Sequence, residues 1–140
     1  MIRHSKLPKD IQDRIQDAAS YLETRHDVLF AYLFGGLSKA APKPLSDVDI
    51  AVYLSENAEC IQARSEIMEN LVDILKTDEI DLIILNQASL SLSMNVLKNN
   101  RLLVDKKPFL RHTYQSLIHR KYFDFHNFES NILEKRFYHG

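Results

Sequence analysis

The chain has 140 residues, with 18 basic and 19 acidic side chains and a formal net charge of −1. This length is typical of one domain, and 45% apolar residues are enough for a buried core. The balanced charge argues against a protein that coats nucleic acid or anionic membrane by bulk electrostatics. The single cysteine, Cys60, excludes an internal disulfide and a cysteine-rich zinc site.

No apolar run approaches the roughly 18 residues that cross a bilayer. The N-terminal segment runs into the charged residues Lys9, Asp10 and Asp13, so it does not resemble a signal peptide. We therefore expect a cytoplasmic protein with no membrane association, folded as a single domain over residues 1–140.

The pattern of apolar residues predicts alternating helices and strands. Helical spacing from Ile11 to Leu22 predicts a first helix that begins near Pro8. The apolar run 28–34 is short and rich in β-forming residues, which indicates a buried strand. The later elements are predicted in this order: a short helix over 37–41, a strand over 47–54, a helix over 61–75, a strand over 80–85, a helix over 89–99, an edge strand over 101–104 and a helix over 108–137.

This order of elements predicts a mixed α/β domain, in which a small central sheet is flanked by helices. We expect the core to occupy about residues 10–105. A C-terminal aromatic helical segment is expected over about residues 108–138.

Two carboxylates stand at the start of the second predicted strand. Alternate side chains of a strand share a face, so Asp47 and Asp49 point the same way while Val48 and Ile50 point into a core. Neighbouring carboxylates repel each other, and a divalent cation commonly compensates. Oxygen ligands at this spacing suit Mg²⁺. Asp81 opens the third predicted strand and completes a triad if the two strands are neighbours.

The glycine pair Gly35-Gly36 ends the first predicted strand of a chain that has only three glycines. Such a junction offers backbone N–H groups to a phosphate, although a tight turn is the simpler interpretation. Ten residues, Leu37 to Ser46, separate the pair from Asp47. A phosphate cradle beside metal-binding carboxylates describes a nucleoside triphosphate site for phosphoryl or nucleotidyl transfer.

The segment from Leu33 to Val52 resembles the signature of the polymerase-β-type nucleotidyltransferases, and most closely that of their minimal, stand-alone members. The family pattern is Gly-Ser, ten residues, Asp-x-Asp, and a third Asp on a later strand. The run from Ile80 to Leu85, with Asp81, matches that later strand. The resemblance covers about residues 10–105 and implies the nucleotidyltransferase fold.

The resemblance also implies roles for the site residues. ATP is expected over Gly35 and Gly36, with its triphosphate bound through Mg²⁺ to Asp47 and Asp49. Asp81 is expected to act as the general base on the attacking hydroxyl and to contact a metal ion as well.

The chain departs from the family pattern in the glycine loop. Gly36 stands where the family usually has Ser, whose hydroxyl contacts the triphosphate, and Ala40 stands where a second Gly is common. Lys39 replaces a frequent Arg and is expected to neutralise phosphate charge. Ser46 is expected to contact the phosphate or the metal loop. The simpler interpretations are a solvated lysine and a turn serine.

Minimal nucleotidyltransferases of this kind are often the antitoxin of a two-gene toxin–antitoxin pair whose toxin resembles a HEPN ribonuclease. The resemblance implies transfer of AMP from ATP to a tyrosine of that toxin. One alternative is a degenerate site, indicated by Gly36, in a protein that neutralises its toxin by binding alone. Another is transfer to RNA or a small molecule, but such enzymes usually carry an additional substrate domain.

The C-terminal segment, residues 111–140, holds seven of the thirteen aromatic residues and four of the six histidines. It is either a helix packed on the sheet or an interface with another molecule. Basic residues interleave with the aromatic ones, but the near-neutral net charge favours a protein partner, and direct nucleic-acid binding is not expected. His119 and His126 lack metal-ligand spacing.

Overall fold

The structure is a computed structural model that describes residues 10–38 and 47–139. It confirms the predicted order of helices and strands. The elements are α1 (Ile11–Thr24), β1 (Val28–Phe34), the 3-10 helix η1 (Gly35–Ser38), β2 (Val48–Leu54), α2 (Cys60–Leu75), β3 (Ile80–Ile84), the 3-10 helix η2 (Leu85–Gln87), α3 (Leu90–Lys98), β4 (Asn100–Asp105) and α4 (Pro108–His139).

Two predicted helix boundaries differ from the structure or lie outside the residues that it describes. The short helix expected over residues 37–41 is a 3-10 turn that begins earlier, at Gly35. Residues 39–41, and Pro8 at the expected start of the first helix, lie outside the described residues.

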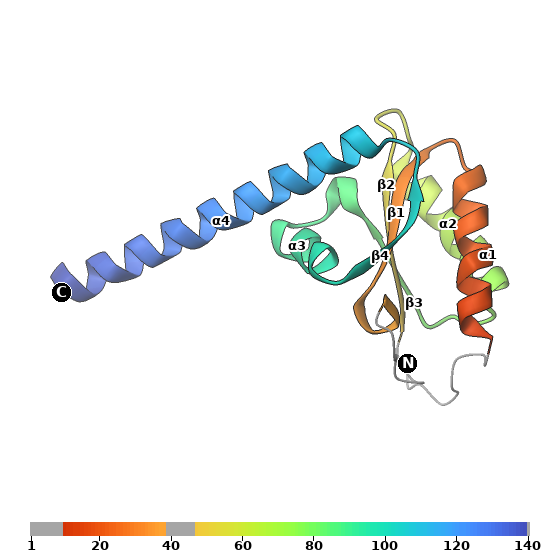
Figure 1. The fold of residues 1–140 in the computed structure, drawn as a ribbon, viewed down its shortest axis with the longest axis horizontal. Helices are drawn as coiled ribbons and strands as arrows, with labels where there is room; N and C mark the ends of the chain where they lie inside the picture. Colours follow the sequence, from red (N-terminus) through yellow and green to blue (C-terminus); the bar gives the residue numbers. More distant parts are fainter. Residues whose placement is uncertain (1–9, 39–46, 140) are drawn as a thin grey trace.

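The four strands form one mixed sheet in the order β3-β2-β1-β4 (Figure 1). β1 pairs antiparallel with both β2 and β4, whereas β2 and β3 are parallel. Parallel neighbours need a long crossover connection, and α2 supplies it. The predicted mixed sheet flanked by helices is therefore confirmed.

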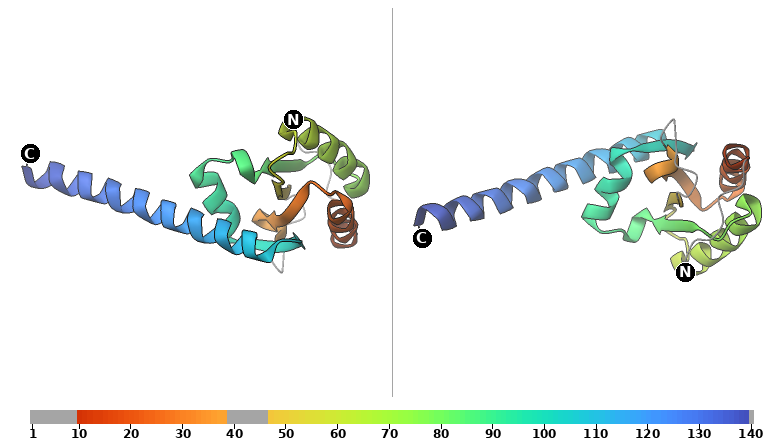
Figure 2. Two further views of the ribbon diagram at one scale, coloured as in Figure 1. Left: turned by 90° about the horizontal axis from the view of Figure 1, so that it is seen from above. Right: turned by 90° about the horizontal axis from the view of Figure 1, so that it is seen from below.

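Helices cover both faces of the sheet (Figures 1 and 2). On one face, α1 and α2 pack Leu22 and Leu71 against Ile50 of β2. On the other face, α3 and the beginning of α4 lie against Phe30 and Tyr32 of β1. Because β1 is buried on both sides, its sequence is continuously apolar rather than alternating.

Helix α4 leaves the body of the domain after its first turns and extends outward as a single rod (Figure 1). Tyr114 and Ile118 are buried, and the Gln115 side chain donates a hydrogen bond of 2.8 Å to the Tyr32 hydroxyl. Farther along, Phe125 and Phe128 are 51% and 64% exposed. The inner turns of the helix therefore pack on the sheet, and the interface expected for the exposed aromatic residues stays a prediction.

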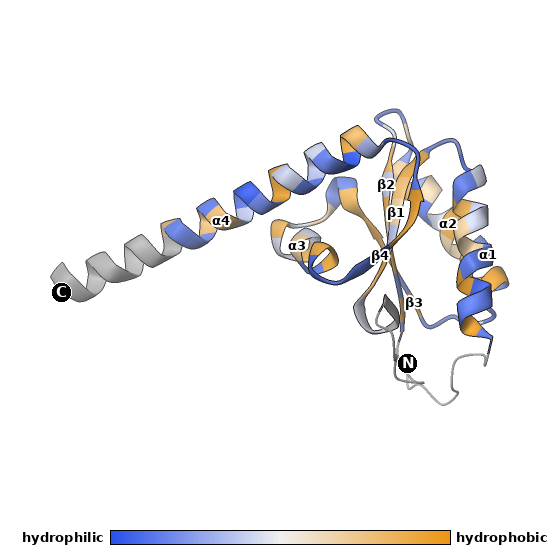
Figure 3. Cartoon of the chain, in the orientation of Figure 1, coloured by the Kyte–Doolittle hydropathy of each residue, from blue (hydrophilic) through white to orange (hydrophobic). Residues whose placement is uncertain are grey.

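Along the coloured part of α4, hydrophobic and hydrophilic residues follow one another (Figure 3). None of the helices in residues 10–38 and 47–139 combines the length and apolar character of a membrane span.

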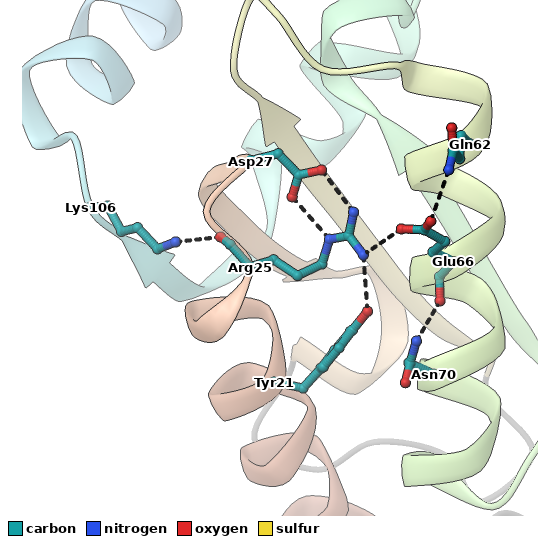
Figure 4. A network of polar contacts seen from close by, with 7 residues as sticks. All are labelled: Tyr21, Arg25, Asp27, Gln62, Glu66, Asn70 and Lys106. Carbon is teal, nitrogen blue, oxygen red and sulfur yellow. Dashed lines mark hydrogen bonds and ion pairs between the residues drawn. The ribbon is translucent and has the colours of Figure 1, made fainter.

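A polar network ties α1 to α2 and to the segment after β4 (Figure 4). The Arg25 guanidinium donates two hydrogen bonds, of 2.9 and 2.8 Å, to the Asp27 carboxylate and a third, of 3.0 Å, to Glu66 of α2. The Lys106 ammonium donates to the Arg25 carbonyl over 2.6 Å. The hydrogen bonds from Arg25 hold the pKa of Asp27 below its ordinary value, against the opposing effect of burial.

Candidate active site

The predicted site residues lie at the end of the sheet where β1 ends and β2 and β3 begin. In the sheet register, Asp49 of β2 is opposite Phe34, the last residue of β1, on one side and Asp81 of β3 on the other. Neighbouring strands are about 4.8 Å apart, so Asp49 and Asp81 are adjacent across the ladder.

Asp49 and Asp81 belong to the face of the sheet that α3 and α4 cover. Residues in register share a face, and Ala51 and Ile83, each two residues beyond Asp49 and Asp81, belong to the core on that side. Asp47 precedes β2 and is two residues before Asp49, the spacing at which side chains of a strand share a face. The register thus places Asp49 and Asp81 on one face at one end of the sheet, while Val48 and Ile50 pack into the opposite core.

Gly35 is the residue that brings backbone against this site. Its φ is +70°, in the left-handed region that favours glycine. A Cβ placed on Gly35 would collide with the Asp49 carboxylate, whose Cγ would be only 3.3 Å away. The sequence predicted close approach of this backbone to a phosphate, and the structure shows close approach to Asp49.

The glycine loop is described only in part. Gly36 follows Gly35 within η1, whereas Lys39 and Ser46 lie outside the described residues. Their expected contacts with phosphate or the metal loop stay predictions.

The donor chemistry of the site fits Mg²⁺. Asp47 and Asp49 are half-buried and Asp81 is exposed. Mg²⁺ typically takes one or two carboxylates and completes its shell with water and substrate phosphates. Within the described part of the chain, no group of three His, Cys, Asp or Glu side chains could already hold a metal ion. Binding of Mg²⁺ by Asp47 and Asp49, with Asp81 as a third ligand, therefore stays a prediction.

Arg64 and Gln87 are neighbours of the site that sequence reasoning missed. A groove of about 310 Å³ runs along the outer side of β3 and is lined by Asp81, Arg64, Gln87 and Leu92 among others. The Arg64 guanidinium donates a hydrogen bond of 3.2 Å to the Leu82 carbonyl. Nothing in the sequence separates Arg64 from the other polar residues on α2, because only the fold brings α2 beside Asp81.

The sequence model of the family described as polymerase beta, nucleotidyltransferase, matches residues 16–109. The chain belongs to the polymerase beta nucleotidyltransferase family. The match includes all four strands of the sheet and the three aspartates at its end. A search of curated proteins found no match to this chain.

Several solved structures with the same fold come from toxin–antitoxin complexes. A chain of a mutant of the toxin–antitoxin pair MntA-HpeT is 22% identical, with a TM-score of 0.69, over 87% of this chain and 98% of its own. A chain of a toxin–antitoxin complex with AMP-PNP is 23% identical, with a TM-score of 0.69 and the same coverage of 87% and 98%.

A third similar structure holds the tri-AMPylated HEPN toxin of Shewanella oneidensis in complex with MNT antitoxin. The matching chain is 23% identical, with a TM-score of 0.66, over 90% of this chain and 98% of its own. At these identities the similarity shows that the fold, including the C-terminal helix, is shared.

Proposed function

We propose that this nucleotidyltransferase is an antitoxin that transfers AMP from ATP to a tyrosine of a HEPN ribonuclease toxin and thereby neutralises it. The observation that carries the proposal is the pairing of Asp49 with Asp81 beside Gly35, in a chain of this family. The similar structure with a tri-AMPylated HEPN toxin supports both the protein acceptor and AMP as the transferred group.

The proposed reaction places a distinct task on each part of the site. Asp47 and Asp49 would hold Mg²⁺, which when bound supplies positive charge to the triphosphate. The backbone at Gly35 and Gly36 would lie along the phosphates. Asp81 would accept the proton of the attacking tyrosine hydroxyl. The new bond joins the tyrosine oxygen to the α-phosphorus, the bond to the β-phosphate oxygen breaks, and pyrophosphate leaves.

Lys39 and Ser46 complete the proposed nucleotide site. Lys39 would neutralise phosphate charge, and Ser46 would contact the phosphate or the metal loop just before Asp47. The field of these groups, fixed before the reaction begins, would lower the barrier by favouring the charge that develops on the leaving pyrophosphate.

Helix α4 supports a protein partner. Phe125 and Phe128 follow Tyr114 and Ile118 at helical spacing, so the helix face that packs on the domain continues beyond it. There both phenylalanines are more than half exposed. Exposed aromatic side chains at this density are typical of protein interfaces.

A second candidate is neutralisation by binding alone. It is favoured by Gly36, which replaces the serine that family members use on the triphosphate, together with the exposed aromatic face of α4. In this case the chain would cover its toxin without modifying it.

Co-expression in growing cells separates the two candidates. The chain is produced together with each HEPN protein encoded in the same genome, first as the parent and then with Asp47, Asp49 and Asp81 all replaced by Asn. The proposal predicts that the parent restores growth and the triple variant does not. Protection by the triple variant would contradict it and establish binding alone.

A further inference from the structure

The outer side of β3 is an open strand edge. β3 is at the end of the sheet order, and no strand in the described ranges pairs with its outer side. The Val48 amide donates to the Glu79 carbonyl over 3.0 Å, which turns the backbone groups of Glu79 and Asp81 toward β2. Backbone groups alternate along a strand, so those of Ile80 and Leu82 point outward.

The hydrogen bond from Arg64 supports this orientation independently. Arg64 extends from α2, outside the sheet, and its guanidinium reaches the Leu82 carbonyl at 3.2 Å. The edge of β3 therefore has backbone hydrogen-bonding groups facing the groove rather than another strand. Such an edge is a template for an added strand.

The groove along this edge connects the site to a larger hollow. The part of about 310 Å³ lies over β3 and includes Asp81. A second part, of about 840 Å³, follows α2 past Ile61 and Met68. Arg64 and Gln87 line both parts. Asp81 therefore lines a groove that shares Arg64 and Gln87 with the hollow along α2.

The position of Gly35 indicates from which side an acceptor hydroxyl can reach Asp81. Asp49 is in contact with Gly35 on the side of β1. Asp81 lies on the opposite side of Asp49 and is exposed toward the groove. A hydroxyl that gives its proton to Asp81 thus approaches most directly over the outer edge of β3.

We propose that this groove binds an extended segment of the acceptor protein, which adds to the edge of β3 and presents its hydroxyl to Asp81. The inference rests on the proposed function and assigns the place where its protein substrate binds. Arg64 and Gln87 act as positioning residues. Arg64, the basic residue of the groove lining, suits an acidic side chain or a carbonyl of the segment.

Steady-state AMP transfer to a HEPN acceptor protein tests the inference with two variants, Arg64→Ala and Gln87→Trp. Arg64→Ala would remove a charged hydrogen bond to the segment, and Gln87→Trp would fill the groove. Each variant should therefore raise the KM for the acceptor about tenfold. The kcat and the KM for ATP should change by less than about twofold, because Arg64 and Gln87 would hold the segment without touching the reacting atoms. Arg64→Lys should restore part of the affinity.

The matched control is Arg101→Ala. Arg101 is an exposed arginine on β4, the opposite edge strand, where it donates a hydrogen bond to the Gln12 side chain. The Arg101→Ala variant should leave the kcat, the KM for the acceptor and the KM for ATP unchanged. Thermal unfolding of all variants establishes that each is folded.

A photo-crosslinking residue at position 87 gives an independent readout. In the complex, the cross-linked acceptor peptide should contain the modified tyrosine or its immediate neighbours. An unchanged KM in both variants, or a cross-link to another part of the acceptor, would overturn this inference alone. A parent chain that transfers AMP to no protein, or only to RNA or a small molecule, would overturn the proposed function and the inference with it.

Discussion

Gly35 determines both the turn after β1 and the position of the Asp49 carboxylate. The positive φ of Gly35 bends the chain out of β1, and the missing side chain leaves the space that the Asp49 carboxylate fills. A side chain at this position would have to displace the carboxylate that we propose as a metal ligand.

We predict that Gly35→Ala lowers the free energy of unfolding by roughly 1–3 kcal/mol, because of its left-handed conformation and the collision with Asp49. It should also reduce AMP transfer. Urea unfolding and a transfer assay measure the two effects. Gly36→Ser, which restores the residue common in the family, is the control and should tighten ATP binding without loss of stability.

We predict that Asp49→Asn reduces AMP transfer about a thousandfold, because it removes charge that holds the metal against the phosphates. The fold should be retained, since the carboxylate is at the rim of the sheet rather than in a core. Asp78→Asn, in the turn before β3, is the matched control and should leave transfer unchanged. Transfer at the parent rate by the Asp49 variant would refute the assignment.

At the scale of elements, the network around Arg25 joins the end of α1 to α2 (Figure 4). Because Arg25 lowers the pKa of Asp27, the ionised carboxylate stabilises the folded state. This contribution is complete above the unfolded-state pKa of about 3.9 and is lost as the pH falls through the lower folded-state pKa.

We therefore predict that Asp27→Asn destabilises the fold by about 1 kcal/mol near neutral pH. The difference from the parent should shrink as the pH falls below about 4, where the parent carboxylate becomes protonated. Urea unfolding of both proteins, from neutral pH to below about pH 4, measures this difference in stability. The exposed Asp17→Asn on α1 is the control, and a pH-independent difference for Asp27→Asn would contradict the explanation.

The sequence determined the elements more completely than the surroundings of the site. The apolar run of β1 and the spacing of α1 and α2 predicted the elements, because burial on one or two faces leaves a periodic pattern. The grouping of Asp47, Asp49 and Asp81 was predicted from the alternation of side chains along a strand and from the family resemblance. Arg64 and Gln87 were missed, because the parallel pairing of β2 and β3 brings distant segments together and leaves no local pattern.

At the scale of the whole molecule, α4 divides the chain into a folded body and an extended arm (Figures 1 and 3). Its inner turns belong to the core through Tyr114 and Ile118, and its outer turns expose aromatic side chains. Helical periodicity predicted the helix but could not show where the supporting surface ends. That boundary depends on the width of the sheet and the position of α3.

We predict that Phe125→Ser combined with Phe128→Ser leaves the stability of the domain unchanged and weakens partner binding at least about tenfold. Both side chains lie beyond the packed turns of α4. Phe109→Ser is the control, since Phe109 is 85% exposed at the start of the helix, away from the outer arm. Thermal unfolding and titration of the HEPN partner measure the two properties, and unchanged affinity in the double variant would exclude the arm as the interface.

The most direct test of the enzymatic proposal is the intact mass of the HEPN partner after incubation with the chain, ATP and Mg²⁺. The proposal predicts a gain of one or more AMP units on the partner, located on tyrosine, with pyrophosphate released and no gain in the Asp49→Asn variant. A stable complex in which the partner keeps its mass would contradict AMP transfer and leave binding alone as the function.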